Sequence, residues 1–111
     1  MQAADFLLEH LARALRDPVD PQQIGSLDPR LHARVNGEIY RFATAQTLAR
    51  FRREPARWCG VLRDPVSGVR FFPARSSPSL ETREGPYFFM SDSTRTAFRS
   101  EPERYAIHRE D

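Results

Sequence analysis

The amino-acid sequence predicts an α+β fold: one domain over residues 1–111, in which an N-terminal helix precedes two tandem ββα(α) units packed as a pseudo-symmetric pair. Two observations predict it. The string Leu-Arg-Asp-Pro-Val at residues 15–19 recurs 47 positions later at residues 62–66. At the same offset, aromatic residues pair in register: Tyr40 with Tyr87, Phe42 with Phe89, Phe51 with Phe98, and Trp58 with Tyr105. We therefore expect one unit over residues 15–58 and its copy over residues 62–105.

The first element is an amphipathic helix expected over residues 3–16. Leu7, Leu11 and Leu15 recur there at helical spacing, and polar residues lie away from this apolar stripe. Asp17-Pro18 ends the helix, because a residue that precedes proline is disfavoured in helical geometry. The turn-rich segment that follows is predicted to be irregular and to be anchored in the core by two apolar residues, Ile24 and Leu27.

A β-hairpin is predicted next, because residues 31–35 alternate between apolar and polar side chains and Asn36-Gly37 is a strong signal for a two-residue turn. The second strand is expected over residues 39–42. In the second unit, residues 69–72 are a strand candidate. Residues 80–83 are expected to pair across Glu84-Gly85-Pro86 with residues 87–90.

Each hairpin is followed by signals for two helical segments. Thr44 is a suitable N-cap for a helix over residues 45–53, and Ser91 holds the corresponding position before a helix that contains Phe98. Pro55 and Pro102 then begin short helical turns, since proline suits the first position of a helix. These turns are expected to end at Trp58 and Tyr105.

Charge is unevenly distributed along the chain. All 17 basic residues are arginine and the formal net charge is +2. Residues 30–63 contain eight arginines and two acidic residues, so the basic excess lies in the first unit. A cluster there defines a candidate basic patch for nucleic acid, although the small net charge argues against such a function. Its members are Arg34, Arg41, Arg50, Arg53 and Arg57.

Several classes of function find no support in the sequence. There is no apolar run long enough to span a membrane and no signal-peptide pattern at the N-terminus, so a cytoplasmic location is expected. Cys59 is the single cysteine, which excludes a disulfide or a multi-thiolate metal cage within one chain. No catalytic triad, paired-carboxylate motif or phosphate-binding loop can be named. We therefore expect a protein that is not an enzyme and holds no cofactor.

Three segments of the second unit resemble the YHS domain, which is related to the TRASH group of metal-binding modules. They are Asp64-Pro65-Val66-Ser67-Gly68, Gly85-Pro86-Tyr87-Phe88-Phe89-Met90-Ser91, and Glu101-Pro102-Glu103-Arg104-Tyr105. The family's usual pattern is similar: Asp-Pro-Val-Cys-Gly, then Gly-x-x-Tyr-Tyr-Phe-Cys-Ser-x-x-Cys, then a closing Pro-Glu-x-Tyr. The first unit resembles the same pattern more weakly. The resemblance implies a metal-related setting, in transporters, in oxygenase components or as a small free-standing protein.

The residues that would bind metal in this family are replaced in both units. The three cysteine positions of the pattern are occupied by Asp20, Ala43 and Thr47 in the first unit and by Ser67, Met90 and Thr94 in the second. Hydroxyl groups do not replace thiolates as ligands at neutral pH, and a thioether is a weak ligand. We therefore predict that neither unit binds metal at these positions.

The leading functional hypothesis is an accessory or protein-interaction module built from degenerate YHS-like units. Phe88 is expected to face away from the core, because its neighbours Tyr87 and Phe89 face into it and side chains alternate along a strand. Together with Phe71 it would form an apolar surface for a protein partner or for self-association. One alternative is a metal-handling protein with a weak site at Met90, at Cys59 or between chains. The other alternative is nucleic-acid binding through the basic patch.

Overall fold

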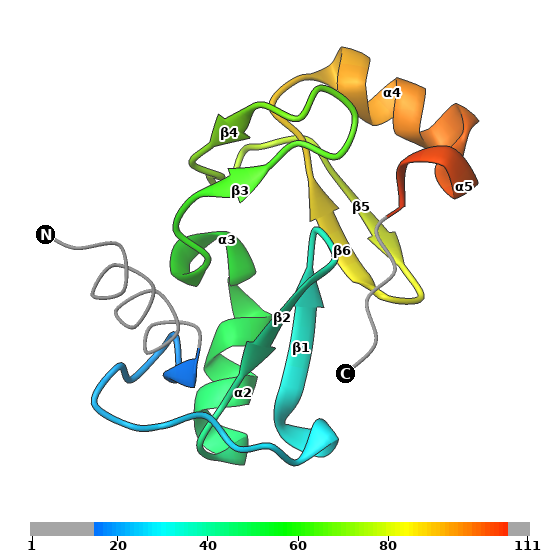
Figure 1. Ribbon diagram of the computed structural model, residues 1–111. Helices are drawn as coiled ribbons and strands as arrows, with labels where there is room; N and C mark the ends of the chain where they lie inside the picture. Colours follow the sequence, from blue (N-terminus) through cyan, green and yellow to red (C-terminus); the bar gives the residue numbers. More distant parts are fainter. Residues whose placement is uncertain (1–14, 107–111) are drawn as a thin grey trace, which may run out of the picture. The chain divides into compact units, whose positions relative to one another are not determined.

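The protein is described by a computed structural model that places residues 15–106 (Figure 1). Apart from its last two residues, the helix expected over residues 3–16 lies outside the described residues. Short helices alternate with small antiparallel strand pairs, which confirms the α+β class. Within the described part of the chain, no helix is both long enough and apolar enough to cross a membrane.

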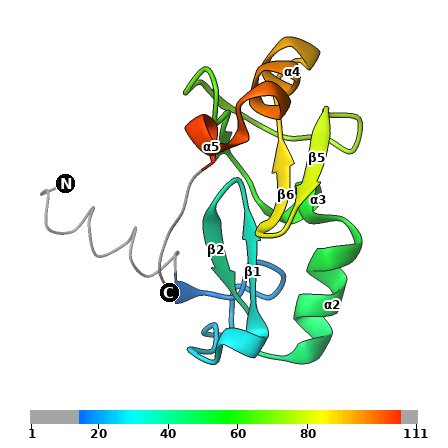
Figure 2. The same ribbon diagram turned by 90° about the vertical axis from the view of Figure 1, so that its right-hand side faces the viewer.

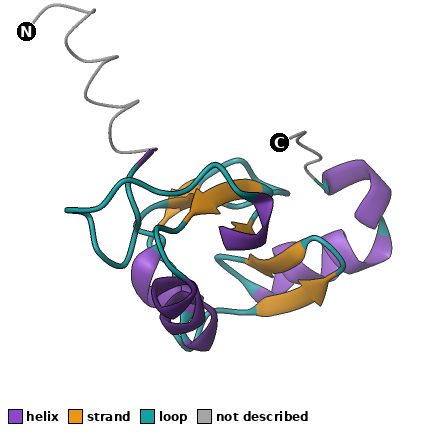
Figure 3. Ribbon diagram, turned by 90° about the horizontal axis from the view of Figure 1, so that it is seen from below, coloured by secondary structure: helices purple, strands orange, loops and turns teal. Residues whose placement is uncertain are grey.

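Figure 3 distinguishes the helices from the strands by colour. Three two-stranded sheets pair β1 with β2, β3 with β4, and β5 with β6. In order, the elements are a 3₁₀ turn η1 (Pro29–Leu31), β1 (His32–Val35), β2 (Glu38–Arg41), α2 (Ala45–Arg53), α3 (Pro55–Trp58), β3 (Leu62–Arg63), β4 (Arg70–Phe71), β5 (Ser79–Thr82), β6 (Gly85–Phe88), α4 (Asp92–Ser100) and α5 (Pro102–Tyr105).

Four of these elements recur at the offset found in the sequence. Adding 47 to the bounds of β1, β2, α2 and α3 yields the bounds of β5, β6, α4 and α5, and the order of the second set can be followed in Figures 1 and 2. The predicted N-caps of α2 and α4 are both confirmed. Thr44 Oγ1 accepts a hydrogen bond from the Thr47 N–H at 3.1 Å, and Ser91 Oγ accepts one from the Thr94 N–H at 3.2 Å. These are the N-cap interactions that the capping residues predict.

The described chain divides into two compact units that do not coincide with the predicted repeats. The first unit comprises residues 15–33 and Tyr40–Arg53, and the second comprises Arg34–Ile39 together with residues 54–106. The tip of the first hairpin therefore belongs to the second unit. Asn36 and Gly37 form the expected two-residue turn, with φ values of 51° and 75°. Positive φ at both positions is typical of a type I′ turn, which suits a hairpin.

The second hairpin has a tighter turn than predicted. Thr82 pairs with Gly85 and Glu81 with Pro86, so the turn is formed by Arg83 and Glu84, and Gly85 lies in the strand. Gly85 has a φ of 102°, which disfavours a side chain. β4 is shorter than the predicted strand and pairs with β3, for which the sequence analysis predicts no strand.

The core of the first unit is formed by α2 and the strand that precedes it. Phe42, Leu48 and Phe51 are buried, and the ring of Phe51 lies 4.9 Å from that of Phe42 and 5.3 Å from that of Tyr40, measured between centroids. Aromatic rings at such distances are in favourable tilted contact. The first unit thus has a small core of its own.

The core of the second unit contains the aromatic residues at the corresponding positions. Tyr87, Phe89 and Phe98 are buried, with the Phe98 ring centroid 4.8 Å from that of Tyr87 and 5.3 Å from that of Phe89. Val66, Leu80, Tyr105 and Ala106 pack against this cluster. Each unit thus contains a small aromatic core of the same composition.

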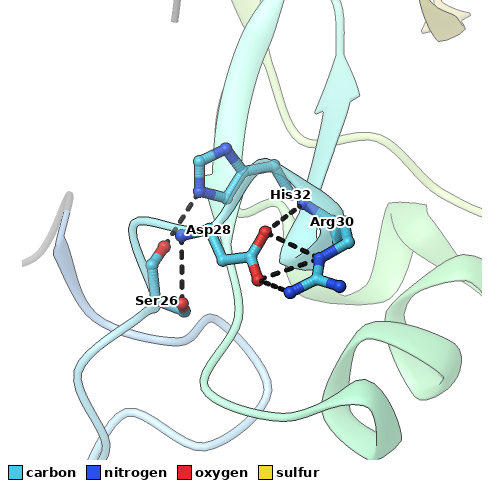
Figure 4. A network of polar contacts seen from close by, with 4 residues as sticks. All are labelled: Ser26, Asp28, Arg30 and His32. Carbon is cyan, nitrogen blue, oxygen red and sulfur yellow. Dashed lines mark hydrogen bonds and ion pairs between the residues drawn. The ribbon is translucent and has the colours of Figure 1, made fainter.

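The prediction that Ile24 and Leu27 anchor the segment before β1 is wrong, because their exposed fractions are 62% and 78%. Polar contacts hold this segment instead. As Figure 4 shows, Asp28 accepts hydrogen bonds from Arg30, and a ring nitrogen of His32 lies 2.9 Å from the carbonyl oxygen of Ser26. In a short, turn-rich segment, local polar side chains form hydrogen bonds with the backbone N–H and C=O groups, so the segment does not need apolar anchors.

Candidate functional site

The candidate site of the second unit is centred on Asp64, which is fully buried. Oδ1 accepts hydrogen bonds from the N–H groups of Val66 and Ser67, at 2.8 and 3.1 Å. Oδ2 accepts one from the Met90 N–H at 3.0 Å and one from the Thr94 hydroxyl at 2.7 Å. The carboxylate therefore joins the loop after β3, the segment between β6 and α4, and the first turn of α4.

The first unit contains the same arrangement around Asp17, which is also fully buried. Oδ1 accepts hydrogen bonds from the N–H groups of Val19 and Asp20, at 2.8 and 3.2 Å. Oδ2 accepts one from the Ala43 N–H at 2.9 Å and one from the Thr47 hydroxyl at 2.5 Å. Each donor position lies 47 residues before its counterpart around Asp64.

The two carboxylates are held in their ionised form. Burial by itself raises the pKa of Asp64, but the hydrogen bonds from Met90, Thr94, Ser67 and Val66 outweigh it, so that the pKa lies below its ordinary value. The pKa of Asp17 is lowered in the same way: burial raises it, and the hydrogen bonds from Thr47 and from backbone N–H groups more than compensate. Hydrogen bonds donated to a carboxylate stabilise its charged form. Both groups are therefore anions at neutral pH.

The positions where the resemblance places metal ligands converge on these carboxylates. In the second unit Ser67, Met90 and Thr94 all contact Asp64, and Ser67 Oγ lies 3.6 Å from Met90 Sδ. In the first unit, Asp17 brings together the corresponding residues Asp20, Ala43 and Thr47.

The donor atoms present do not suit a metal ion. A carboxylate has about four lone-pair positions, and Asp64 accepts four hydrogen bonds. The remaining groups near it are hydroxyls and one thioether, which are poor ligands for the metals that thiolates bind. Among residues 15–106, no group of three or more His, Cys, Asp and Glu side chains is arranged to hold a metal. In both units, the positions where the resemblance places metal ligands are instead linked to a buried carboxylate and a threonine hydroxyl.

The predicted exposure of Phe88 is wrong. Its exposed fraction is 8%, and Phe71 is half-buried. Alternation along β6 does direct Phe88 away from Tyr87, but its side chain is buried as well. The hairpin tip, whose residues Val35 and Asn36 are themselves buried, contacts the edge of β6 at the backbone of Phe88.

Asn36 makes this contact, although the sequence pattern predicts only a turn at this position. Its Oδ1 accepts a hydrogen bond from the Phe88 N–H at 2.7 Å, and its Nδ2 donates to the carbonyl oxygens of Phe88 and Arg63, both at 3.0 Å. The Asn36 N–H also donates to the carbonyl oxygen of Pro86 at 3.1 Å. The sequence carries no signal for these contacts, because they join residues 27 and 52 positions apart.

The predicted basic patch is divided between the two units. Arg41, Arg50 and Arg53 belong to the first unit, whereas Arg34 and Arg57 belong to the second. Arg34 and Arg41 are half-buried, and the guanidinium of Arg57 lies 4.7 Å from the ring centroid of Trp58. Binding of nucleic acid through these five residues stays a prediction. Cys59, the single thiol, is half-buried at the end of α3.

Exposed apolar side chains of the second unit lie mainly beside the β3–β4 pair. Val61, which precedes β3, is 47% exposed, and Phe72, which follows β4, is 77% exposed. Val69 and Met90 are each about half exposed. Phe72 therefore replaces Phe88 as the aromatic residue available at the surface.

Searches against protein-family models, curated proteins and solved structures returned no match to this chain.

Proposed function

We propose that this protein is a non-enzymatic protein-interaction module built from two degenerate YHS-like repeats, over residues 15–58 and 62–105. The proposal has two parts, a metal-free scaffold and an exposed apolar surface. The scaffold part is supported by the recurrence of the same carboxylate arrangement around Asp17 and Asp64, at the positions where the resemblance places metal ligands.

The observation that carries the interaction part is the exposure of Phe72. A side chain of this size loses about 2 kcal/mol or more of favourable transfer free energy when it stays in water. Its exposed fraction is 77%, and Val61 is exposed beside the same strand pair. Exposed large apolar side chains that lie together are typical of surfaces that bind protein partners. We define the interaction surface as Val61, Arg63, Arg70 and Phe72.

Affinity capture from lysate of the source cells, followed by quantitative mass spectrometry, tests the proposal with the variant Phe72→Ser. The matched control is Leu27→Ser, because Leu27 is 78% exposed in the first unit, outside the proposed surface. Wild type and Leu27→Ser should capture the same proteins, and Phe72→Ser should lose them. Identical capture by all three proteins would contradict the proposal. Light scattering of each variant identifies self-association, in which case the captured partner is a second copy.

A further inference from the structure

Two arginines face each other on the interaction surface. β3 and β4 are antiparallel, with Arg63 directly opposite Arg70 and Leu62 opposite Phe71. Residues directly opposite each other in such a pair project their side chains from the same face, with Cβ atoms about 5 Å apart. Arg63 and Arg70 are exposed, whereas Leu62 on the other face is buried. The outer face of this strand pair therefore presents two adjacent guanidinium groups.

Like charges directly opposite each other destabilise a strand pair. Elsewhere among the described residues, arginines such as Arg30, Arg95 and Arg104 form ion pairs with acidic neighbours. No ion pair or side-chain hydrogen bond of the Arg63 or Arg70 guanidinium is found within residues 15–106. The Arg63 carbonyl oxygen, by contrast, accepts a hydrogen bond from Asn36, which holds β3 in position. The backbone thus holds the guanidinium groups of Arg63 and Arg70 opposite each other despite their electrostatic repulsion. An anion bound between these two groups would relieve that repulsion.

We propose that the interaction surface binds an extended, acidic segment of a partner protein. A carboxylate of the partner lies between Arg63 and Arg70, and an apolar side chain lies on Phe72 and Val61. This inference rests on the proposed function and specifies the chemistry of the partner.

The spacing of the surface residues sets the pattern of the partner. Arg70 and Phe72 are two positions apart on one strand, as are Val61 and Arg63 on the other. Side chains two positions apart on an extended chain point to the same side, about 7 Å from each other. The matching partner therefore carries an apolar residue and an acidic residue separated by one residue. Arginine suits this task because its planar fork binds carboxylates through two hydrogen bonds.

A protein segment agrees better with this surface than a nucleic acid does. The second unit contains nine arginines and eight acidic residues, so it lacks the broad excess of positive charge that tracks a phosphate backbone. Within residues 15–106, the outer face of β3–β4 carries two arginines that form no ion pair with another described residue, and the other two residues of the surface, Val61 and Phe72, are apolar. This composition suits one carboxylate beside one apolar side chain.

Selection from a display library of short random peptides tests the inference. Wild type should enrich peptides with an apolar residue and an acidic residue separated by one position. The double variant Arg63→Glu/Arg70→Glu should lose at least tenfold in affinity for these peptides and should instead enrich Lys or Arg at the acidic position. The control Arg83→Glu/Arg99→Glu makes the same change in net charge at exposed positions away from this surface, and it should behave like wild type.

Other outcomes separate this inference from the proposed function. Enrichment of apolar peptides without acidic residues, lost on Phe72→Ser but kept on Arg63→Glu/Arg70→Glu, would overturn the inference and leave the interaction module intact. Binding of a single-stranded oligonucleotide in place of any peptide would overturn both. Far-ultraviolet circular dichroism of each variant shows whether it is folded. If the charge-reversed variant does not fold, Arg63→Gln/Arg70→Gln replaces it and should lose the preference for acidic residues.

Discussion

The side-chain amide of Asn36 binds both backbone hydrogen-bonding groups of Phe88. Oδ1 accepts from the Phe88 N–H at 2.7 Å and Nδ2 donates to the Phe88 carbonyl oxygen at 3.0 Å, so the amide acts as a neighbouring strand would. The second N–H of the same amide reaches the Arg63 carbonyl oxygen. One buried side chain thus joins the hairpin tip, β3 and β6 within the second unit.

Replacing Asn36 by Asp should destabilise the protein by about 2–4 kcal/mol at pH 7. Aspartate has the same shape and tolerates the positive φ, but its carboxylate cannot donate and would face two carbonyl oxygens. Urea unfolding measures the effect. Gln22→Glu makes the same chemical change at an exposed position and should alter stability by less than about 0.5 kcal/mol. Equal unfolding midpoints for the two variants would contradict the assigned role of Asn36.

The hydrogen bond between Asp64 and Thr94 should appear as a coupling free energy. In a double-mutant cycle with Asp64→Asn and Thr94→Val, we expect a coupling of about 2 kcal/mol, because hydrogen bonds to charged groups contribute about 1.5–3 kcal/mol. Thr96→Val is the control, since Thr96 is exposed on the same helix. Its coupling to Asp64→Asn should be close to zero. A cycle between Asp17 and Thr47 should have the same sign, and couplings indistinguishable from the control would refute the arrangement.

Stability should decrease in acid because of the two buried aspartates. Hydrogen bonds lower the pKa of Asp17 and Asp64 below their unfolded value, which is about 3.9. Their contribution to folding is therefore complete above about pH 4 to 5 and is lost as the pH falls through the lower pKa of the folded state. Unfolding midpoints measured between neutral and acid pH check this. The variant Asp64→Asn, although less stable, should depend less steeply on pH below that range.

Gly85 should not tolerate a side chain. An added Cβ would lie 2.2 Å from the Arg34 carbonyl oxygen, and the φ of 102° disfavours any L-residue. Gly60 provides the control, because it has a positive φ of 67° and no atom within 4 Å of an added Cβ. Gly60→Ala should cost about 1 kcal/mol and Gly85→Ala at least about 2 kcal/mol more, as measured by thermal unfolding. Similar losses for both would show that backbone conformation alone accounts for the effect.

Thiolates introduced at three converging positions should create a metal site in the second unit. Ser67 Oγ lies 3.6 Å from Met90 Sδ, and Ser67, Met90 and Thr94 each donate a hydrogen bond to Asp64, so side chains at the three positions converge. Thiolates are the ligands that structural zinc sites prefer. The variant Ser67→Cys/Met90→Cys/Thr94→Cys also frees an oxygen of Asp64 as a fourth ligand. Elemental analysis should find one zinc per chain. A variant with the third cysteine at Ser100 should bind less, and equal zinc contents would argue against the convergence.

Local elements were predictable from short-range signals. Thr44, Ser91, Pro55 and Pro102 mark helix ends that the structure confirms, because caps and prolines act within one turn of backbone. The Asn36-Gly37 turn follows from the positive φ that these residues tolerate. The turn at Arg83 and Glu84 was misplaced because Gly85 and Pro86 are the stronger turn residues, although the offset of 47 from Asn36 indicates the observed position.

Contacts between distant segments were not predictable from local pattern. Alternation along β6 correctly set Phe88 apart from Tyr87 and Phe89, but it cannot show whether both faces of a strand are covered. Ile24 and Leu27 are apolar residues that the folded chain leaves exposed. β4 lies within the predicted strand over residues 69–72, but its partner β3 has only two residues, too few for a periodic signal.

The α+β class, the bounds of α2, α3 and α5 and the start of α4 could be predicted from the amino-acid sequence alone. Capping, proline geometry and ligand chemistry are properties of residue type and spacing, so they can be read without coordinates. The convergence of four hydrogen-bond donors on each of Asp17 and Asp64 depends on the tertiary structure. So do the position of Arg63 opposite Arg70 and the burial of Phe88. Burial and the pairing of charges depend on which segments meet in space, and a linear pattern does not contain that information.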